Sequence, residues 1–90
     1  MSKREKRLEK LRQSPKDVSF EQLRQVLEDH GFILTKVTGS HHTFKRKIGQ
    51  EEIRLTIPYR KPLLAIYVSQ AIDEIDRIQS LEHGEEKNDE

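Results

Sequence analysis

Three segments of alternating apolar and polar residues, separated by glycine-containing turns, lie in residues 31–58, GFILTKVTGSHHTFKRKIGQEEIRLTIP. Aromatic and β-branched residues occupy many of the apolar positions, as is usual in strands. The pattern predicts strands over residues 32–37, 41–48 and 52–57, with turns at 38–40 and 49–50. We therefore expect a three-stranded antiparallel meander.

A helix is predicted on each side of this sheet. Ser19 and Gln22 have the spacing of a capping box, and the apolar residues that follow predict a helix over residues 20–30. Beyond Pro62, apolar residues at helical spacing predict a second helix that ends near Leu81; they are Leu64, Val68, Ala71, Ile72, Ile75 and Ile78. The expected fold is α+β, with both helices on one face of the sheet and the other face open.

The two ends of the chain differ from this central part. Residues 3–13 are good helix formers whose only apolar residues are Leu8 and Leu11, enough to dock on a neighbouring element. Residues 14–18 contain a proline and are predicted to be a linker. From Glu82 onward no apolar residue occurs, so an acidic, disordered tail is expected. The predicted division is an N-terminal helix and linker at 1–18, a domain at 19–81 and a tail at 82–90.

Composition limits the chain to one small domain. Of the 90 residues, 32% are hydrophobic and 37% are charged, which provides for a single thin core. No apolar run approaches the roughly 18 to 20 residues that span a bilayer, and the N-terminus has no signal-peptide stretch. The lack of cysteine excludes a disulfide framework and a thiol nucleophile. We expect a soluble cytoplasmic protein that does not contact membranes.

Positive charge is concentrated in the middle of the chain. Residues 36–61 hold seven cations and two carboxylates, a balance of +5, which favours a polyanionic partner. Because side chains alternate along a strand, burial of Phe44 and Ile48 places His42 and Arg46 on the core side and their neighbours on the open face. The predicted open face carries His41, Thr43, Lys45, Lys47, Arg54 and Thr56.

This surface suits RNA better than duplex DNA. The C-terminal helix exposes side chains that phosphates would mostly repel, namely Gln70, Asp73, Glu74 and Asp76, so no direct DNA binding is expected. A flat basic sheet can instead hold RNA phosphates. The predicted RNA-binding residues are Lys45, Lys47, Arg54, Ser40 and Thr43, and Arg60 and Lys61 in the loop between two prolines are secondary candidates.

One histidine on the open face can supply acid–base chemistry. His41 follows a turn in which Gly39 permits positive φ, and imidazole titrates near neutral pH, so His41 is the predicted general acid or base. RNA can be cut without a metal, because its own 2′-hydroxyl attacks the adjacent phosphate. His42 points to the core side and is predicted to be structural, with a secondary role in the site.

Other kinds of site are not indicated. Adjacent histidines on a strand diverge and no third ligand is suitably spaced, so neither a metal site nor a cofactor is predicted. Ser40 has no orienting acid that would make it a nucleophile. His30 and His83 are expected to be solvated.

Several motifs in this order resemble the HicA (YcfA-like) toxins of bacterial type II toxin–antitoxin modules. They are Asp29-His30-Gly31-Phe32, Gly39-Ser40-His41-His42-Thr43-Phe44, Leu55-Thr56-Ile57-Pro58, Lys61-Pro62 and Ile66-Tyr67-Val68, within residues 15 to 80. The resemblance implies a fold like that of double-stranded-RNA-binding domains, metal-independent cleavage of mRNA and a HicB-type antitoxin as partner. It also implies that His41, directly after Gly39-Ser40, is the catalytic histidine.

Two other functions fit the same residues. A non-catalytic RNA-binding module would use the same basic face, with His41 making only a hydrogen bond. A protein-interaction domain would dock a partner on a sheet edge or on the C-terminal helix, and its affinity for RNA would be weak and insensitive to salt. Cleavage separates the nuclease from the first alternative.

Overall fold

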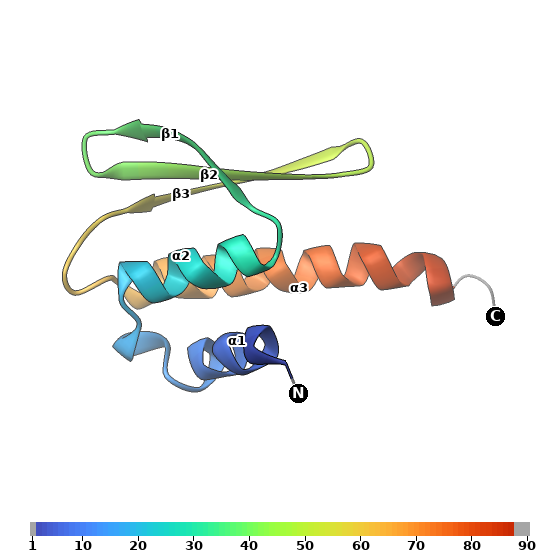
Figure 1. Cartoon of the computed structure of the whole chain (residues 1–90), viewed down its shortest axis with the longest axis horizontal. Coiled ribbons are helices and arrows are strands. Elements are labelled where there is room, and N and C mark those ends of the chain that lie inside the picture. The colour runs from blue at the N-terminus through green and yellow to red at the C-terminus, as the bar shows by residue number, and fades with distance from the viewer. Residues whose placement is uncertain (1, 88–90) are drawn as a thin grey trace.

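The computed structural model describes residues 2–87, with side chains up to Leu81. In chain order the elements are α1 (Lys3–Gln13), the 3-10 helix η1 (Pro15–Asp17), α2 (Phe20–Asp29), β1 (Ile33–Thr38), β2 (His41–Ile48), β3 (Glu51–Pro58) and α3 (Ala65–Lys87). The strands form one antiparallel sheet in the order β1-β2-β3 (Figure 1). The predicted α+β fold is confirmed.

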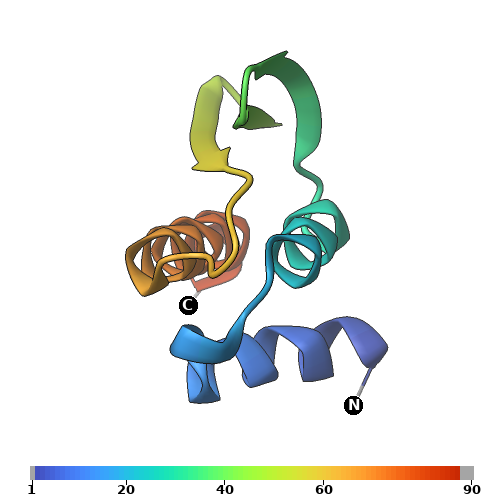
Figure 2. The same cartoon turned by 90° about the vertical axis from the view of Figure 1, so that its left-hand side faces the viewer.

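The molecule has three layers, seen end-on in Figure 2. The sheet covers α2 and α3, which lie side by side, and α1 packs beneath these two helices on the side away from the sheet. One face of the sheet is therefore left open, as the strand pattern predicts.

The core lies between the sheet and the two central helices. Phe44 of the middle strand is fully buried, and so are Val68 and Ile75 of α3. Along β3, Ile53, Leu55 and Ile57 are buried while the residues between them are exposed, which confirms the predicted alternation. The start of α2 is also as predicted. Ser19 Oγ accepts from the Gln22 amide (3.2 Å), and Gln22 Oε1 accepts from the Ser19 amide (2.8 Å).

Helix α3 differs from its predicted bounds at both ends. It begins at Ala65, and the residue that turns into the core before it is Leu63, whereas Leu64 is 47% exposed. It continues to Lys87 instead of ending near Leu81, so residues 82–87 are helical where the sequence pattern predicts disorder. Glutamate and lysine are good helix formers, and a helix already anchored in the core extends through them at little cost. Residues 88–90 of the predicted tail lie outside the described residues.

Two ion pairs and two leucines hold α1 in place. Leu8 and Leu11 are buried, as expected for a docked helix. Arg7 donates to both carboxylate oxygens of Asp29 in α2, at 2.6 and 2.7 Å. Arg12 makes the same two-pronged contact with Asp76 in α3. These bidentate contacts tie α1 to both helices of the central layer.

The two clamps predict a loss of stability in acid. Hydrogen bonds from Arg7 and Arg12 lower the pKa of the Asp29 and Asp76 carboxyls below the ordinary value of about 3.9. As pH falls, the unfolded chain therefore takes up protons before the folded chain does. The clamp contribution is present above about pH 4 and is lost as pH falls through the lowered values.

Urea unfolding between pH 6 and pH 2.5 tests this expectation. The double variant Asp29→Asn/Asp76→Asn should lose less stability across this range than the native chain, because its clamps do not titrate. The difference between the two pH profiles gives the contribution of Asp29 and Asp76, because all other carboxylates are the same in both chains. Parallel pH profiles for the two chains would contradict the assignment.

Candidate nucleic-acid interface

The strand register places four of the predicted RNA-binding residues on the open face; they are Thr43, Lys45, Lys47 and Arg54. Thr43 lies opposite Thr56, with their hydroxyl oxygens 3.4 Å apart, and Lys45 lies opposite Arg54. On the other side of β2, Lys36 of β1 is the partner of Thr43. Like charges directly opposite one another destabilise a sheet. A polyanion bound at Lys45 and Arg54 would therefore reduce the repulsion between these two charges.

These side chains surround a shallow hollow of about 400 Å³. Its lining consists of three cations and three threonines: Lys36, Lys45, Arg54, Thr35, Thr43 and Thr56. None of the lining residues is acidic. Ammonium, guanidinium and hydroxyl groups are the donors that bind phosphate oxygens, so the hollow is a candidate phosphate site. Lys36 and Thr35 were not among the predicted site residues, because the β-bulge between Leu34 and Lys36 shifts the register there.

One acidic residue also belongs to this face. Glu52 lies directly opposite Lys47, two positions from Arg54 along β3. The period of two along the strand is the signal that places it there. An opposite charge across the strand pair reduces the attraction of Lys47 for a phosphate, so Lys45 and Arg54 are the stronger candidates.

His41 and His42 are the first two residues of β2. They lie at the end of the sheet where the β1–β2 turn is hydrogen-bonded to the loop after β3, through the Tyr59 amide and the Ser40 carbonyl. Gly39 forms this turn with φ of 59°, as predicted. His41 is exposed and pairs with Pro58 on the open face. His42 is half-buried on the helix side, as the alternation predicts.

The Ser40 carbonyl organises this end of the molecule. It accepts a hydrogen bond from the Tyr59 amide (2.7 Å) and another from the His42 ring (Nδ1, 3.0 Å). Because a carbonyl oxygen only accepts, Nδ1 carries the proton, and Nε2 of the neutral ring is left as an acceptor. Ser40 thus acts through its backbone in fixing the tautomer and orientation of His42.

Three rings, from α2, β2 and the loop after β3, meet beside this contact. The His42 ring lies 4.8 Å from the buried Phe20 ring at the start of α2, and Tyr59 lies 4.9 Å from Phe20. The sequence pattern does not reveal this cluster, because its members are distant in the chain. Arg60 and Lys61, the secondary candidates, are exposed and follow Tyr59 directly. They therefore lie on the same loop as Tyr59, one of the three rings of the cluster.

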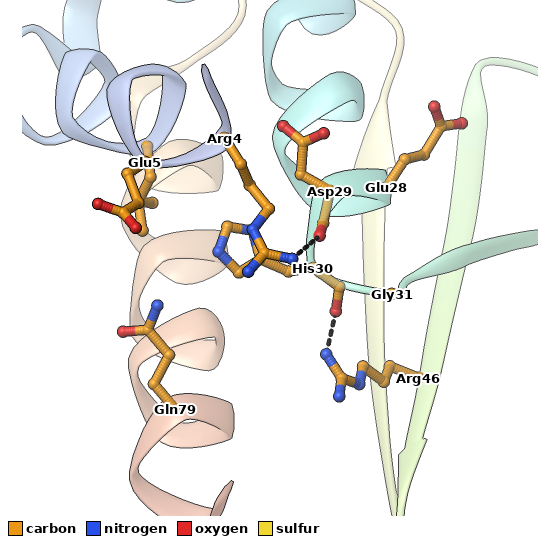
Figure 3. Close-up of a pocket in the computed structure, with 9 residues that line it drawn as sticks. Arg4, Glu5, Glu28, Asp29, His30, Gly31, Arg46 and Gln79 are labelled. Carbon is orange, nitrogen blue, oxygen red and sulfur yellow. Dashed lines mark hydrogen bonds between the residues drawn. The ribbon is translucent and has the colours of Figure 1, made fainter. Parts of the chain in front are cut away.

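A larger hollow, of about 660 Å³, lies at the opposite end of α2 (Figure 3). There Arg4 donates to the Asp29 carbonyl (3.3 Å) and Arg46 to the His30 carbonyl, so both arginines cap the C-terminal carbonyls of the helix. His30 is 9% exposed and its Nδ1 donates to the Val26 carbonyl (2.9 Å), so the expectation that it is solvated is wrong. Burial by α1, which the local sequence does not predict, explains the difference. The two arginines in this hollow therefore have a structural role at the C-terminus of α2.

Neither a metal centre nor a membrane span is found in the described residues. No three histidine, aspartate or glutamate side chains whose positions are described gather as ligands for a metal ion. None of the helices within residues 2–87 is both long and apolar enough to cross a membrane. The side chain of His83 lies outside the described residues.

An open basic sheet backed by two helices is the architecture of a double-stranded-RNA-binding-like domain. A family model described as HicA toxin of bacterial toxin–antitoxin matches residues 20–78, from the start of α2 into α3. The chain belongs to the HicA toxin family. Such a toxin implies a cognate antitoxin as partner. Comparison with curated proteins gives no match, and comparison with solved structures gives none either. Helix α1 and η1 lie outside the matched residues.

Proposed function

We propose that the chain is a metal-independent endoribonuclease that cleaves mRNA, held inactive by a HicB-type antitoxin. Toxins of the HicA family are mRNA interferases, which supports this activity for the chain. The observation that carries the proposal is the oriented imidazole of His42 at the end of a basic sheet. An oriented acid–base group beside phosphate-binding cations is what cleavage of an RNA backbone requires.

The chemistry needs a base, a charge stabiliser and the RNA itself. The base removes the proton of a 2′-hydroxyl, and that oxygen attacks the adjacent phosphorus. The 5′-oxygen leaves and takes up a proton, so the products end in a 2′,3′-cyclic phosphate and a 5′-hydroxyl. Nε2 of His42 is the acceptor for the first proton, because Nδ1 is already committed to Ser40. Arg60 and Lys61, exposed cations that directly follow Tyr59 beside the His42 ring, are the candidate charge stabilisers.

His41 is the alternative base. It is exposed, and it shares the open face with Lys45 and Arg54. Both properties are the reasons for which the sequence pattern predicts His41 as the base. His42 lies on the other side of β2, but an orienting hydrogen bond to the Ser40 carbonyl holds its ring in place. Catalytic bases are held by such contacts, so we favour His42 and keep His41 as the residue that the same experiments test.

RNA binding by this face predicts a strong dependence on salt. If the three cations of the hollow neutralise three phosphates of a single strand, raising salt from 50 to 200 mM weakens binding about 20-fold. The double variant Lys45→Gln/Arg54→Gln should lower the slope of log affinity against log salt by about 1.4. Fluorescence anisotropy with a labelled oligonucleotide measures both values.

The matched control removes two exposed lysines from α1. Lys3→Gln/Lys6→Gln changes the net charge of the chain by the same amount but leaves the open face intact. The control should keep the native slope to within a few tenths. An equal reduction in both variants would mean that the chain binds RNA through its overall charge rather than through this hollow.

Chemical substitution of the substrate tests the reaction class. A long RNA should be cut, and its fragments should end in 2′,3′-cyclic phosphates. The same sequence made with 2′-O-methyl riboses should bind but stay intact, since it has no nucleophile. Fragments that end in a 5′-phosphate would contradict attack by the 2′-hydroxyl.

A further inference from the structure

Tyr59 presents an aromatic ring at the surface beside His42. Tyr59 is 43% exposed, whereas Phe20 beneath it is only 6% exposed. The His42 and Tyr59 rings lie 6.1 Å apart, and each contacts Phe20. The buried phenylalanine thus supports the exposed Tyr59 ring and the half-buried His42 ring.

The backbone holds this exposed ring in place. The Tyr59 amide donates to the same Ser40 carbonyl that orients His42. Val37, the cross-strand partner of His42 in β1, is 52% exposed. Aromatic and aliphatic surface is therefore concentrated around the His42 imidazole. The exposed Arg60 and Lys61 directly follow Tyr59 in the chain.

We propose that Tyr59 is a stacking platform for one unpaired nucleobase, which positions the adjoining ribose and phosphate at His42. This inference rests on the proposed function and names its substrate as single-stranded RNA. Proteins bind single strands through aromatic rings on which bases stack and cations that hold the backbone, and this end of the molecule has both. Bases within a duplex are already stacked and paired, so a duplex does not fit the platform.

A fluorescent base in an uncleavable strand tests the stacking directly. A set of single-stranded 2′-O-methyl oligonucleotides, each with one 2-aminopurine at a different position, is titrated with the full chain. At the position that stacks on Tyr59, fluorescence should be quenched on binding. Tyr59→Phe keeps the ring and should quench and bind like the native chain. Tyr59→Leu should lose the quenching and bind about 5- to 150-fold more weakly.

Two controls separate stacking from a structural role. Leu64→Ala removes an exposed apolar side chain from the loop before α3 and should leave quenching unchanged. Circular dichroism establishes that Tyr59→Leu is folded at the temperature of the assay. The same oligonucleotide annealed to its complement should bind the native chain and Tyr59→Leu equally.

The outcomes distinguish this inference from the proposed function. Native quenching and affinity in a folded Tyr59→Leu variant, with RNA cleavage by the native chain, would overturn the stacking role alone and leave Tyr59 as a surface for a protein partner. Failure of the native chain to bind or cleave RNA at all would overturn both.

Discussion

Replacing His42 by alanine is expected to slow RNA cleavage by about 10²- to 10⁴-fold, the usual contribution of a general acid–base group. The physical reason is the hydrogen bond from Nδ1 to the Ser40 carbonyl, which leaves Nε2 as a proton acceptor of fixed direction. His42→Gln should lose activity as well, because an amide cannot take up the proton. Initial rates on a labelled RNA give the values.

The neighbouring histidine is the matched control. His41→Ala removes an exposed imidazole one residue away and should reduce cleavage far less than His42→Ala does. Because His42 packs on Phe20, thermal unfolding of each variant is recorded, and rates are compared where all are folded. Loss of activity in His41→Ala with full activity in His42→Ala would reverse the assignment and restore the residue chosen from the sequence pattern.

Phe44→Ala is expected to destabilise the fold by about 3–5 kcal/mol, the range for removal of a buried phenylalanine. Phe44 is fully buried at the centre of the middle strand, between Leu34 on β1 and Leu55 on β3, and packs against Phe20. Its loss leaves a cavity beside Phe20, the ring on which His42 packs. Urea denaturation measures the change.

Ile33→Ala provides the comparison. Ile33 is also an apolar strand residue, but it is 67% exposed, so its replacement should alter stability by no more than about 0.5 kcal/mol. Similar changes in the two variants would mean that the sheet does not pack on the helices as described.

The sheet and its faces could be predicted because they depend on local patterns. Alternation around Phe44 and Leu55 assigns each residue of β2 and β3 to a side, and the register confirms this assignment. The capping box at Ser19 likewise involves groups three residues apart. The end of α3 was not predicted, because the absence of apolar residues after Leu81 indicates disorder, whereas the helix continues to Lys87.

Contacts between distant parts of the chain could not be predicted. The buried state of His30 depends on α1 folding back against α2, and the Arg7–Asp29 clamp joins residues 22 positions apart. The ring cluster at the site has the same origin, since Phe20 begins α2, His42 lies in β2 and Tyr59 lies in the loop after β3. Sequence patterns place His41 on the open face, but they do not reveal that the His42 ring bonds to the Ser40 carbonyl and packs on Phe20.

The most direct test of the proposed activity is strand cleavage of a long mRNA in excess EDTA, with the native chain beside His41→Ala/His42→Ala. The native chain should produce fragments and the double variant should produce none. Cleavage by both would show that neither histidine is required. Salt-sensitive binding without cleavage by either chain would contradict the nuclease and identify the domain as an RNA-binding module.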